Sequence, residues 1–137
     1  GEGRVRSPQV MIVVDSSVWL EHLQGTRRAA LFAEPFCNLS RIVVPSLVLF
    51  EVHRVLAGRV DEEAADLAVG FMRKAKVVDL DPETALRASA CAREHGLATA
   101  DALIYATSLQ HRAELWTQDA HFRGLPGVKF FAKASRD

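Results

Sequence analysis

Four acidic residues occupy positions where a solvated surface is not the obvious explanation for their charge. Asp15 and Asp119 each follow a short apolar run of strand character, whereas Glu51 and Asp101 lie inside segments of helical character. The helical neighbours of Glu51 at three and four positions before it and four after it are apolar, which places it on an apolar stripe. Asp101 shares its helical side with Ile104, so its carboxylate is expected to face the protein.

Each acid also has an ordinary structural explanation. Glu51 could form a buried ion pair with Arg54, three residues further on. Asp15 could cap the helix that follows it, and Asp119 could be a turn residue after a strand. Asp101 lies in a first helical turn, where a negative charge interacts favourably with the helix dipole. Taken singly, none of the four indicates a function.

The combination is more informative, because strand ends and sheet-facing helical positions can converge on one rim of a parallel α/β fold. Carboxylates brought within a few ångströms repel one another, which raises their pKa values unless a cation neutralises them. Mg²⁺ prefers oxygen ligands and commonly bridges protein carboxylates to phosphate. The pattern therefore predicts a divalent-cation site suited to phosphate esters.

The elements that must position these acids alternate between strands and helices. Such alternation predicts an α/β three-layer sandwich with a mainly parallel central sheet of four or five strands flanked by helices. Strands are expected at 10–14, 41–44, 76–80 and 115–117, with a fifth at the edge at 128–131. The first helix is expected to begin after a cap at Ser16 or Ser17 and to stop at Gly25. Further helices are expected at 27–36, at 47–57 with a stop at Gly58, from Asp61, at 82–95 and from Thr99.

The composition fits one folded domain. The 137 residues are 49% hydrophobic, and 17 Lys and Arg balance 17 Asp and Glu, so bulk electrostatic attraction cannot hold a nucleic acid. Any polyanion must be held locally. Candidate phosphate contacts, for which solvated helix faces are the favoured explanation, are Arg27, Arg28, Arg54, Arg73 and Lys74.

Other residue types point away from alternative classes. Cys37 and Cys91 form no C-x-x-C pair, which argues against a disulfide scaffold or a zinc ribbon and favours a reduced cytoplasm. No apolar run approaches the roughly 20 residues of a membrane helix. His121 follows Asp119 by two residues and could contact a substrate. Surface or cap roles are favoured for all five histidines, which lack zinc-hydrolase spacing: His22, His53, His95, His111 and His121.

Residues 1–10 lack an apolar period, so we expect them to be a remnant of recombinant expression or disordered, and we expect residues 11–134 to form the single domain.

Four segments together resemble the PIN-domain ribonucleases of the VapC toxin type. They are VVDSSVWLEHL, PSLVLFEVHRVL, LATADALIYATSL and LWTQD, in the order and approximate spacing of that family. The resemblance spans nearly the whole chain from Met11. It implies a PIN-like fold and an endoribonuclease, dependent on Mg²⁺ or Mn²⁺, that acts as a toxin by cleaving RNA and inhibiting translation.

The resemblance also implies roles for particular residues. Asp15 and Asp101 would be the principal metal ligands, Glu51 a ligand or water-orienting base, and Asp119 a ligand directly or through water. Hydrogen bonds from Ser17 and Thr117 would support them. Whether one or two metal ions act stays open.

The same resemblance implies partners. A cognate VapB-type antitoxin would wrap the toxin and direct a basic side chain toward the acidic pocket, and the toxin would be a homodimer in that complex. Trp19, Leu20 and Leu23 could contribute to the antitoxin groove, with core packing as the favoured alternative.

Three other classes of protein share part of this pattern. A haloacid-dehalogenase-like phosphatase would need a second Asp where Ser17 stands. A phosphoacceptor receiver domain would need a Lys at the late strand end, which here reads Thr117, Gln118 and Asp119. A non-catalytic α/β module that binds metal only for structure is the third.

Overall fold

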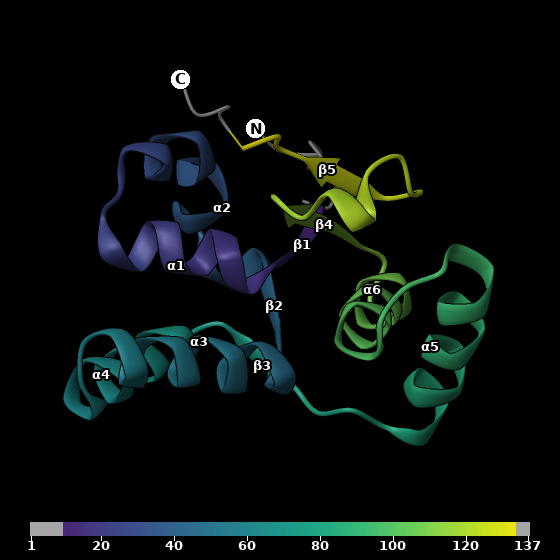
Figure 1. Cartoon of the computed structure of the whole chain (residues 1–137), viewed down its shortest axis with the longest axis horizontal. Coiled ribbons are helices and arrows are strands. Elements are labelled where there is room, and N and C mark those ends of the chain that lie inside the picture. The colour runs from purple at the N-terminus through teal and green to yellow at the C-terminus, as the bar shows by residue number, and fades with distance from the viewer. Residues whose placement is uncertain (1–9, 134–137) are drawn as a thin grey trace, which may run out of the picture.

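A parallel five-stranded sheet forms the centre of the protein (Figure 1). The computed structural model describes residues 10–133. The strands lie in the order β3-β2-β1-β4-β5, and every neighbouring pair is parallel. Their bounds are β1 (Met11–Val14), β2 (Ile42–Pro45), β3 (Lys76–Val78), β4 (Ala113–Thr117) and β5 (Val128–Phe130).

Helices cover both faces of this sheet, which confirms the predicted three-layer α/β sandwich. Figure 1 shows α1 (Ser16–Gln24), α3 (Ser46–Arg59) and α4 (Glu62–Met72) on one side, with α5 (Pro82–His95) and α6 (Thr99–Gln110) on the other. Short helical segments complete the connections: η1 (Arg27–Phe32), α2 (Ala33–Phe36), η2 (Leu39–Arg41) and η3 (Ala120–Phe122).

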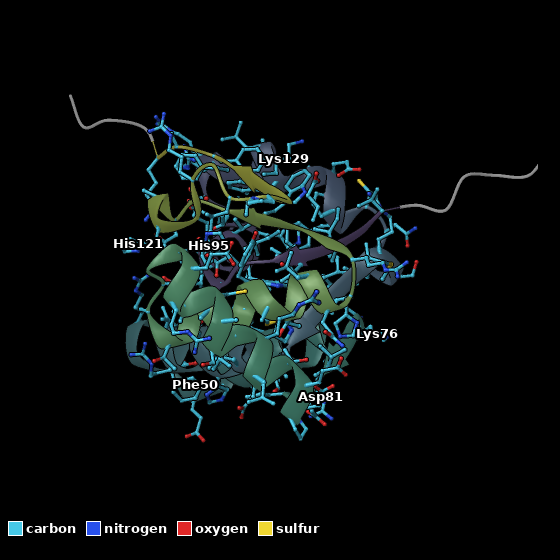
Figure 2. All side chains as sticks on the ribbon, turned by 90° about the vertical axis from the view of Figure 1, so that its right-hand side faces the viewer. Phe50, Lys76, Asp81, His95, His121 and Lys129 are labelled. Carbon is cyan, nitrogen blue, oxygen red and sulfur yellow. The ribbon has the colours of Figure 1, made fainter. Side chains whose placement is uncertain are left out.

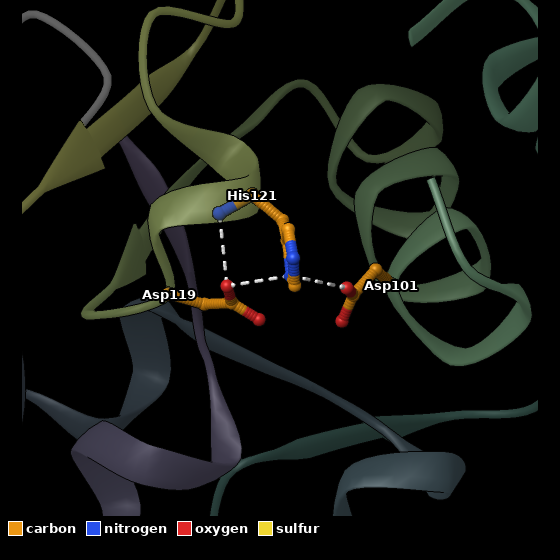
Figure 3. Close-up of side chains that lie close together, drawn as sticks. All are labelled: Asp101, Asp119 and His121. Carbon is orange, nitrogen blue, oxygen red and sulfur yellow. Dashed lines mark hydrogen bonds and ion pairs between the residues drawn. The ribbon is translucent and has the colours of Figure 1, made fainter. Parts of the chain in front are cut away.

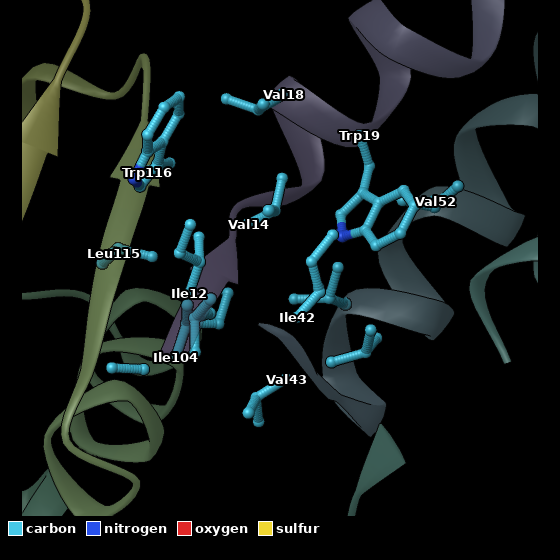
Figure 4. Packing of buried hydrophobic residues seen from close by; sticks show 14 of the residues in the cluster. Ile12, Val14, Val18, Trp19, Ile42, Val43, Val52, Ile104, Leu115 and Trp116 are labelled. Carbon is cyan, nitrogen blue, oxygen red and sulfur yellow. The ribbon is translucent and has the colours of Figure 1, made fainter. Parts of the chain in front are cut away.

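The side chains of the central strand β1 are buried on both faces of the sheet. Ile12, Val13 and Val14 are each at most 1% exposed, as expected for a strand of a parallel sheet that helices cover on both faces. Side chains of β1, β2 and β4 pack with those of α1, α3 and α6 in one core (Figure 4). The β-branched residues suit this environment because they pack well on a pleated surface.

The strand order contains a reversal between β1 and β4. After β1 the chain proceeds to β2 and β3 on one side, and it then crosses through α5 and α6 to β4 on the other side of β1. In open α/β sheets, ligands bind outside the carboxyl ends of the strands at such a point. Asp15 directly follows β1, and Asp119 lies two residues beyond β4.

Several expected boundaries were wrong. Gly58 does not end its helix, because α3 continues to Arg59. Asp15, and not Ser16 or Ser17, is the N-cap of α1, because its side chain accepts a hydrogen bond from the Ser16 backbone N–H.

The segment expected as one short helix at 27–36 divides into η1 and α2, the strand expected at 76–80 ends at 78, and β4 begins at 113 rather than 115. The expected edge strand is β5. The expectations for residues 1–9 and for residue 134 lie outside the described part of the chain.

Two further expectations concern membranes and thiols. Within residues 10–133, no helix is long and apolar enough to cross a membrane. Cys37 and Cys91 are both free thiols, the first exposed and the second buried.

Truncation of a core side chain on β4 tests this architecture. Leu115 is fully buried, so Leu115→Ala should lower the free energy of unfolding by about 2–5 kcal/mol through lost burial and a residual cavity. The matched control is Leu86→Ala on α5, because Leu86 is 75% exposed and its loss should cost less than about 0.5 kcal/mol. Urea unfolding of both variants measures the difference, and equal losses would contradict the packing described.

Candidate functional site

Asp15 is the most buried of the four predicted acids, with 6% of its surface exposed. One carboxylate oxygen, Oδ1, accepts a hydrogen bond of 2.8 Å from the Ser16 backbone N–H. The other, Oδ2, accepts a bond of 2.7 Å from the Thr117 hydroxyl. These two bonds fix the orientation of the carboxylate at the carboxyl end of β1.

Thr117 connects the ends of β1 and β4. Its hydroxyl donates to Asp15 and accepts a hydrogen bond of 3.0 Å from the backbone N–H of Asp119. The predicted supporting role of Thr117 therefore has a geometric basis, because one hydroxyl sets the relative positions of two acids. Asp119 in turn begins η3 as its N-cap residue.

Helix α3 supplies Glu51, and α1 supplies Ser17. Both side chains line the same cavity as Asp15. Glu51 Oε1 and Ser17 Oγ are buried and have no hydrogen-bond partner. The alternative ion pair between Glu51 and Arg54 is not formed, because the Arg54 guanidinium lies over the Phe50 ring, 5.9 Å from its centroid, and bears only weakly on Glu51.

Asp101 and Asp119 meet through a histidine whose closeness to both acids the sequence analysis did not foresee. His121 Nδ1 lies 3.0 Å from Asp119 Oδ1 and 3.7 Å from Asp101 Oδ2 (Figure 3). The His121 backbone N–H also donates to Asp119 Oδ1, at 2.9 Å. One ligand atom from each of the three side chains lies within 4.8 Å of the others. The only sequence signal for His121 was its position two residues after Asp119.

One open cavity of about 620 Å³ joins all four predicted acids. Its walls come from the ends of β1 and β4, the first turns of α1 and α6, the second turn of α3, and the segment around β5. The lining residues that form the acidic wall are Asp15, Ser16, Ser17, Glu51, Asp101 and Asp119.

The surroundings of this cavity disfavour the ionised forms of its carboxyl groups. Burial raises the pKa of Asp15, although the hydrogen bonds from Thr117 and Ser16 act against it and the nearby Asp101 and Asp119 add to it. Burial also raises the pKa of Glu51, with the charges of Asp15 and Asp101 adding to the effect. For Asp101, burial and the charge of Asp119 raise the pKa, and His121 partly offsets them. A positive charge in the cavity would therefore stabilise the ionised carboxylates.

A hard divalent cation fits this donor set. The available groups are carboxylate oxygens, a supporting hydroxyl and the His121 imidazole, with oxygen donors in the majority and no thiolate, which suits Mg²⁺ or Mn²⁺ rather than a thiolate-preferring metal. The unpartnered oxygens of Glu51 and Ser17 are consistent with the same interpretation, since buried polar atoms ordinarily have a partner.

Other residues singled out in the sequence lie elsewhere. Trp19 is fully buried, so core packing, the explanation favoured for it from the sequence, accounts for it rather than a surface groove. Arg28 is committed to structure, because it donates to the Gln118 side chain at 2.6 Å and to the Ala132 carbonyl at 3.0 Å. The other candidate phosphate contacts do not line the cavity; these are Arg27, Arg54, Arg73 and Lys74.

The fold and the site together define a parallel α/β sandwich with an acidic cavity at the reversal point of its sheet. The sequence matches the PIN domain family model over residues 12–128, and the chain therefore belongs to the PIN domain family. A search of curated proteins finds no match.

Solved structures share the fold. A toxin–antitoxin complex from Klebsiella pneumoniae superposes with a TM-score of 0.73 at 24% identity, covering 86% of this chain and 95% of that one. VapC20 from Mycobacterium tuberculosis, described as a Sarcin-Ricin loop cleaving toxin, has a TM-score of 0.72 at 18% identity, covering 85% and 96%. PAE2754 from Pyrobaculum aerophilum has a TM-score of 0.68 at 22% identity, covering 88% and 89%.

The burial of Asp101, together with repulsion from Asp119, should be visible in the pH dependence of stability. The raised pKa of Asp101 means that its ionisation opposes folding, so wild-type protein in EDTA should lose stability relative to Asp101→Asn as pH rises above the ordinary value of 3.8. At neutral pH the variant should be the more stable protein, and below pH 3.8 the difference should vanish. Thermal unfolding across this range measures both, and a variant less stable than wild type at neutral pH would contradict the account.

Proposed function

We propose that this protein is a metal-dependent endoribonuclease that acts as the toxin of a toxin–antitoxin pair. The observation that carries the proposal is the convergence of Asp15, Glu51, Asp101 and Asp119 on one cavity at the carboxyl ends of β1 and β4. Membership in the PIN domain family supports it, as does the shared fold with structures described as VapBC complexes and with a toxin that cleaves the Sarcin-Ricin loop. RNA as substrate implies action in the cytoplasm.

Asp15 and Asp101 would be the principal ligands of a Mg²⁺ or Mn²⁺ ion, with Asp119 a ligand directly or through water. When bound, the ion lowers the pKa of a water molecule and neutralises charge on the phosphate in the transition state. Glu51 either joins the ligands or orients that water through Oε1, which has no other partner, and its raised pKa suits it to accept the proton. Cleavage leaves a 5′-phosphate and a 3′-hydroxyl.

The supporting residues keep the acids in position. Thr117 holds Asp15 and the Asp119 backbone through one hydroxyl, so the two acids cannot move independently. Ser17 Oγ lies in the same cavity and is free to donate to a carboxylate or to a bound water. This arrangement avoids a reorganisation cost at the moment of reaction.

A surface suited to an antitoxin lies on the helical layer on the other side of the sheet from α5 and α6. An apolar cavity of about 360 Å³ lies between α1, α3 and α4, with Leu67 71% exposed and Val60 58% exposed at its edge. Exposed apolar patches of this kind mark protein contacts. We propose that a VapB-type antitoxin segment covers it; of the sequence candidates Leu23 lines this cavity, while Leu20 packs against the core. A homodimer within that complex stays a prediction.

A non-catalytic metal-binding module is the alternative that the site itself leaves, since the PIN domain match gives the phosphatase no support. The two differ in whether an RNA phosphodiester is cleaved when the metal is present.

Neutralising a predicted ligand should remove activity without unfolding the protein. Asp15→Asn and Asp101→Asn should each lower RNA cleavage by a factor of about 10² or more, because ligand charge and geometry are both lost. The control Asp79→Asn removes an exposed carboxylate outside the cavity and should leave cleavage unchanged. Cleavage of a labelled RNA is compared with circular dichroism of each variant, and full activity of Asp101→Asn would refute the site assignment.

Removal of metal provides the second test. Purified protein incubated with total cellular RNA should produce new 5′-phosphate ends in Mg²⁺ or Mn²⁺ and none in EDTA, and sequencing of those ends identifies the target. Cleavage that persists in EDTA would exclude the metal-dependent mechanism. Tight metal binding with no cleavage of any RNA would support the non-catalytic alternative.

A further inference from the structure

The cavity has a second wall whose chemistry is opposite to that of the acids. It comes from η3, β5 and the residues after β5, and it contributes Arg123, Phe130 and Lys133 to the lining. Arg123 and Lys133 are the cations among the cavity's lining residues, and within residues 10–133 neither of them forms an ion pair with an acid. Both are exposed, so they are free to meet a ligand.

Arg123 is held at this wall by an aromatic ring. Its guanidinium lies 5.8 Å from the centroid of the Phe130 ring, within the range of a cation–π contact. The contact orients the planar guanidinium while its N–H donors stay open to solvent. A guanidinium with open donors is well suited to bidentate contact with phosphate oxygens.

Lys133 is brought to the cavity by a different anchor. Arg28 donates to the side chain of Gln118 and to the carbonyl of Ala132, so it ties the end of β4 to the chain next to Lys133. Gln118 and Ala132 are themselves lining residues. Arg28 is therefore a positioning residue for this wall, which explains why this arginine is not a free phosphate contact.

Binding of RNA requires the positive charges of this second wall, because the acidic wall alone would repel the RNA backbone. Four ionised carboxylates and one divalent cation leave an excess of two negative charges in the cavity, which repels a phosphodiester. Arg123 and Lys133 supply two positive charges in the lining of the same cavity. A chain with zero net charge cannot supply this attraction from its surface as a whole.

We infer that Arg123 and Lys133 are the RNA-positioning residues of this protein and hold backbone phosphates that flank the cleaved bond. The strand then runs along the cavity between the acidic wall and the β5 wall. This inference rests on the proposed ribonuclease function, and it assigns the substrate-binding side of the same cavity. Arg27, Arg54, Arg73 and Lys74 do not line the cavity and have no part in it.

Lys129, on β5 between Arg123 and Lys133 in the sequence, offers a matched control. Its ammonium lies over the Trp116 ring, 4.3 Å from the centroid, and it does not line the cavity. Figure 2 shows Lys129 at the upper edge of the molecule, away from His121 beside the acids. A substitution there removes the same charge from β5 without touching the proposed RNA path.

The test measures binding and cleavage separately. In an Asp101→Asn background, which prevents cleavage, Arg123→Gln and Lys133→Gln should each weaken binding of a short fluorescein-labelled single-stranded RNA about tenfold in fluorescence anisotropy. Each should also lower the slope of log affinity against log salt by about 0.7, the value for one lost phosphate contact on a single strand. Lys129→Gln should change neither quantity, and Arg123→Lys should restore the slope.

In the otherwise wild-type enzyme, Arg123→Gln and Lys133→Gln should raise KM and leave kcat unchanged, with thermal unfolding as the control for folding. Unchanged affinity and slope in both variants, or equal weakening by Lys129→Gln, would overturn the inference. Absence of RNA binding by every form would also overturn it. Failure of the ribonuclease proposal is recognised independently, because the wild-type protein would then bind RNA through this wall without cleaving it.

Discussion

The removal of carboxylates from water, to which their mutual repulsion adds, is the constraint on which this site depends. Asp15 is almost fully removed from water, yet its two oxygens are fixed by the Ser16 backbone and the Thr117 hydroxyl and cannot turn away. Asp101 and Glu51 approach the same cavity from two helices that pack on opposite faces of the sheet. Such an arrangement lowers the stability of the folded state unless a positive charge neutralises it, so the site favours binding of a divalent cation.

The sheet order explains how four residues far apart in the sequence reach one cavity. The reversal between β1 and β4 leaves the carboxyl ends of two adjacent parallel strands free of a direct connection, and α3 and α6 reach that edge from either side. The same cavity is also lined by residues at and around β5, so two cations, Arg123 and Lys133, share it with the acids. The chain can therefore have zero net charge and still be strongly polarised at one place.

The elements of the fold could be predicted because they depend on local signals, and the convergence of the four acids follows from the sheet that these elements form. The apolar run of β1, the cap and proline of α5 at Asp81 and Pro82, and the left-handed Gly96 each specify an element within a few residues. The role of His121 could not be predicted, because it depends on η3 turning the imidazole between two acids from different elements. Arg28, Arg123 and Lys133 are similar, since only the tertiary arrangement decides which cation is committed to structure and which faces the cavity.

The most direct test of the central claim is anomalous diffraction from crystals of the protein soaked in Mn²⁺. The account predicts an anomalous peak in the cavity, within coordination distance of Asp15 and Asp101 and close to Asp119, and no such peak in crystals of Asp101→Asn. A peak at some other place in the molecule, or an intact cavity without bound Mn²⁺ while Asp15, Glu51 and Asp101 are ionised, would contradict it.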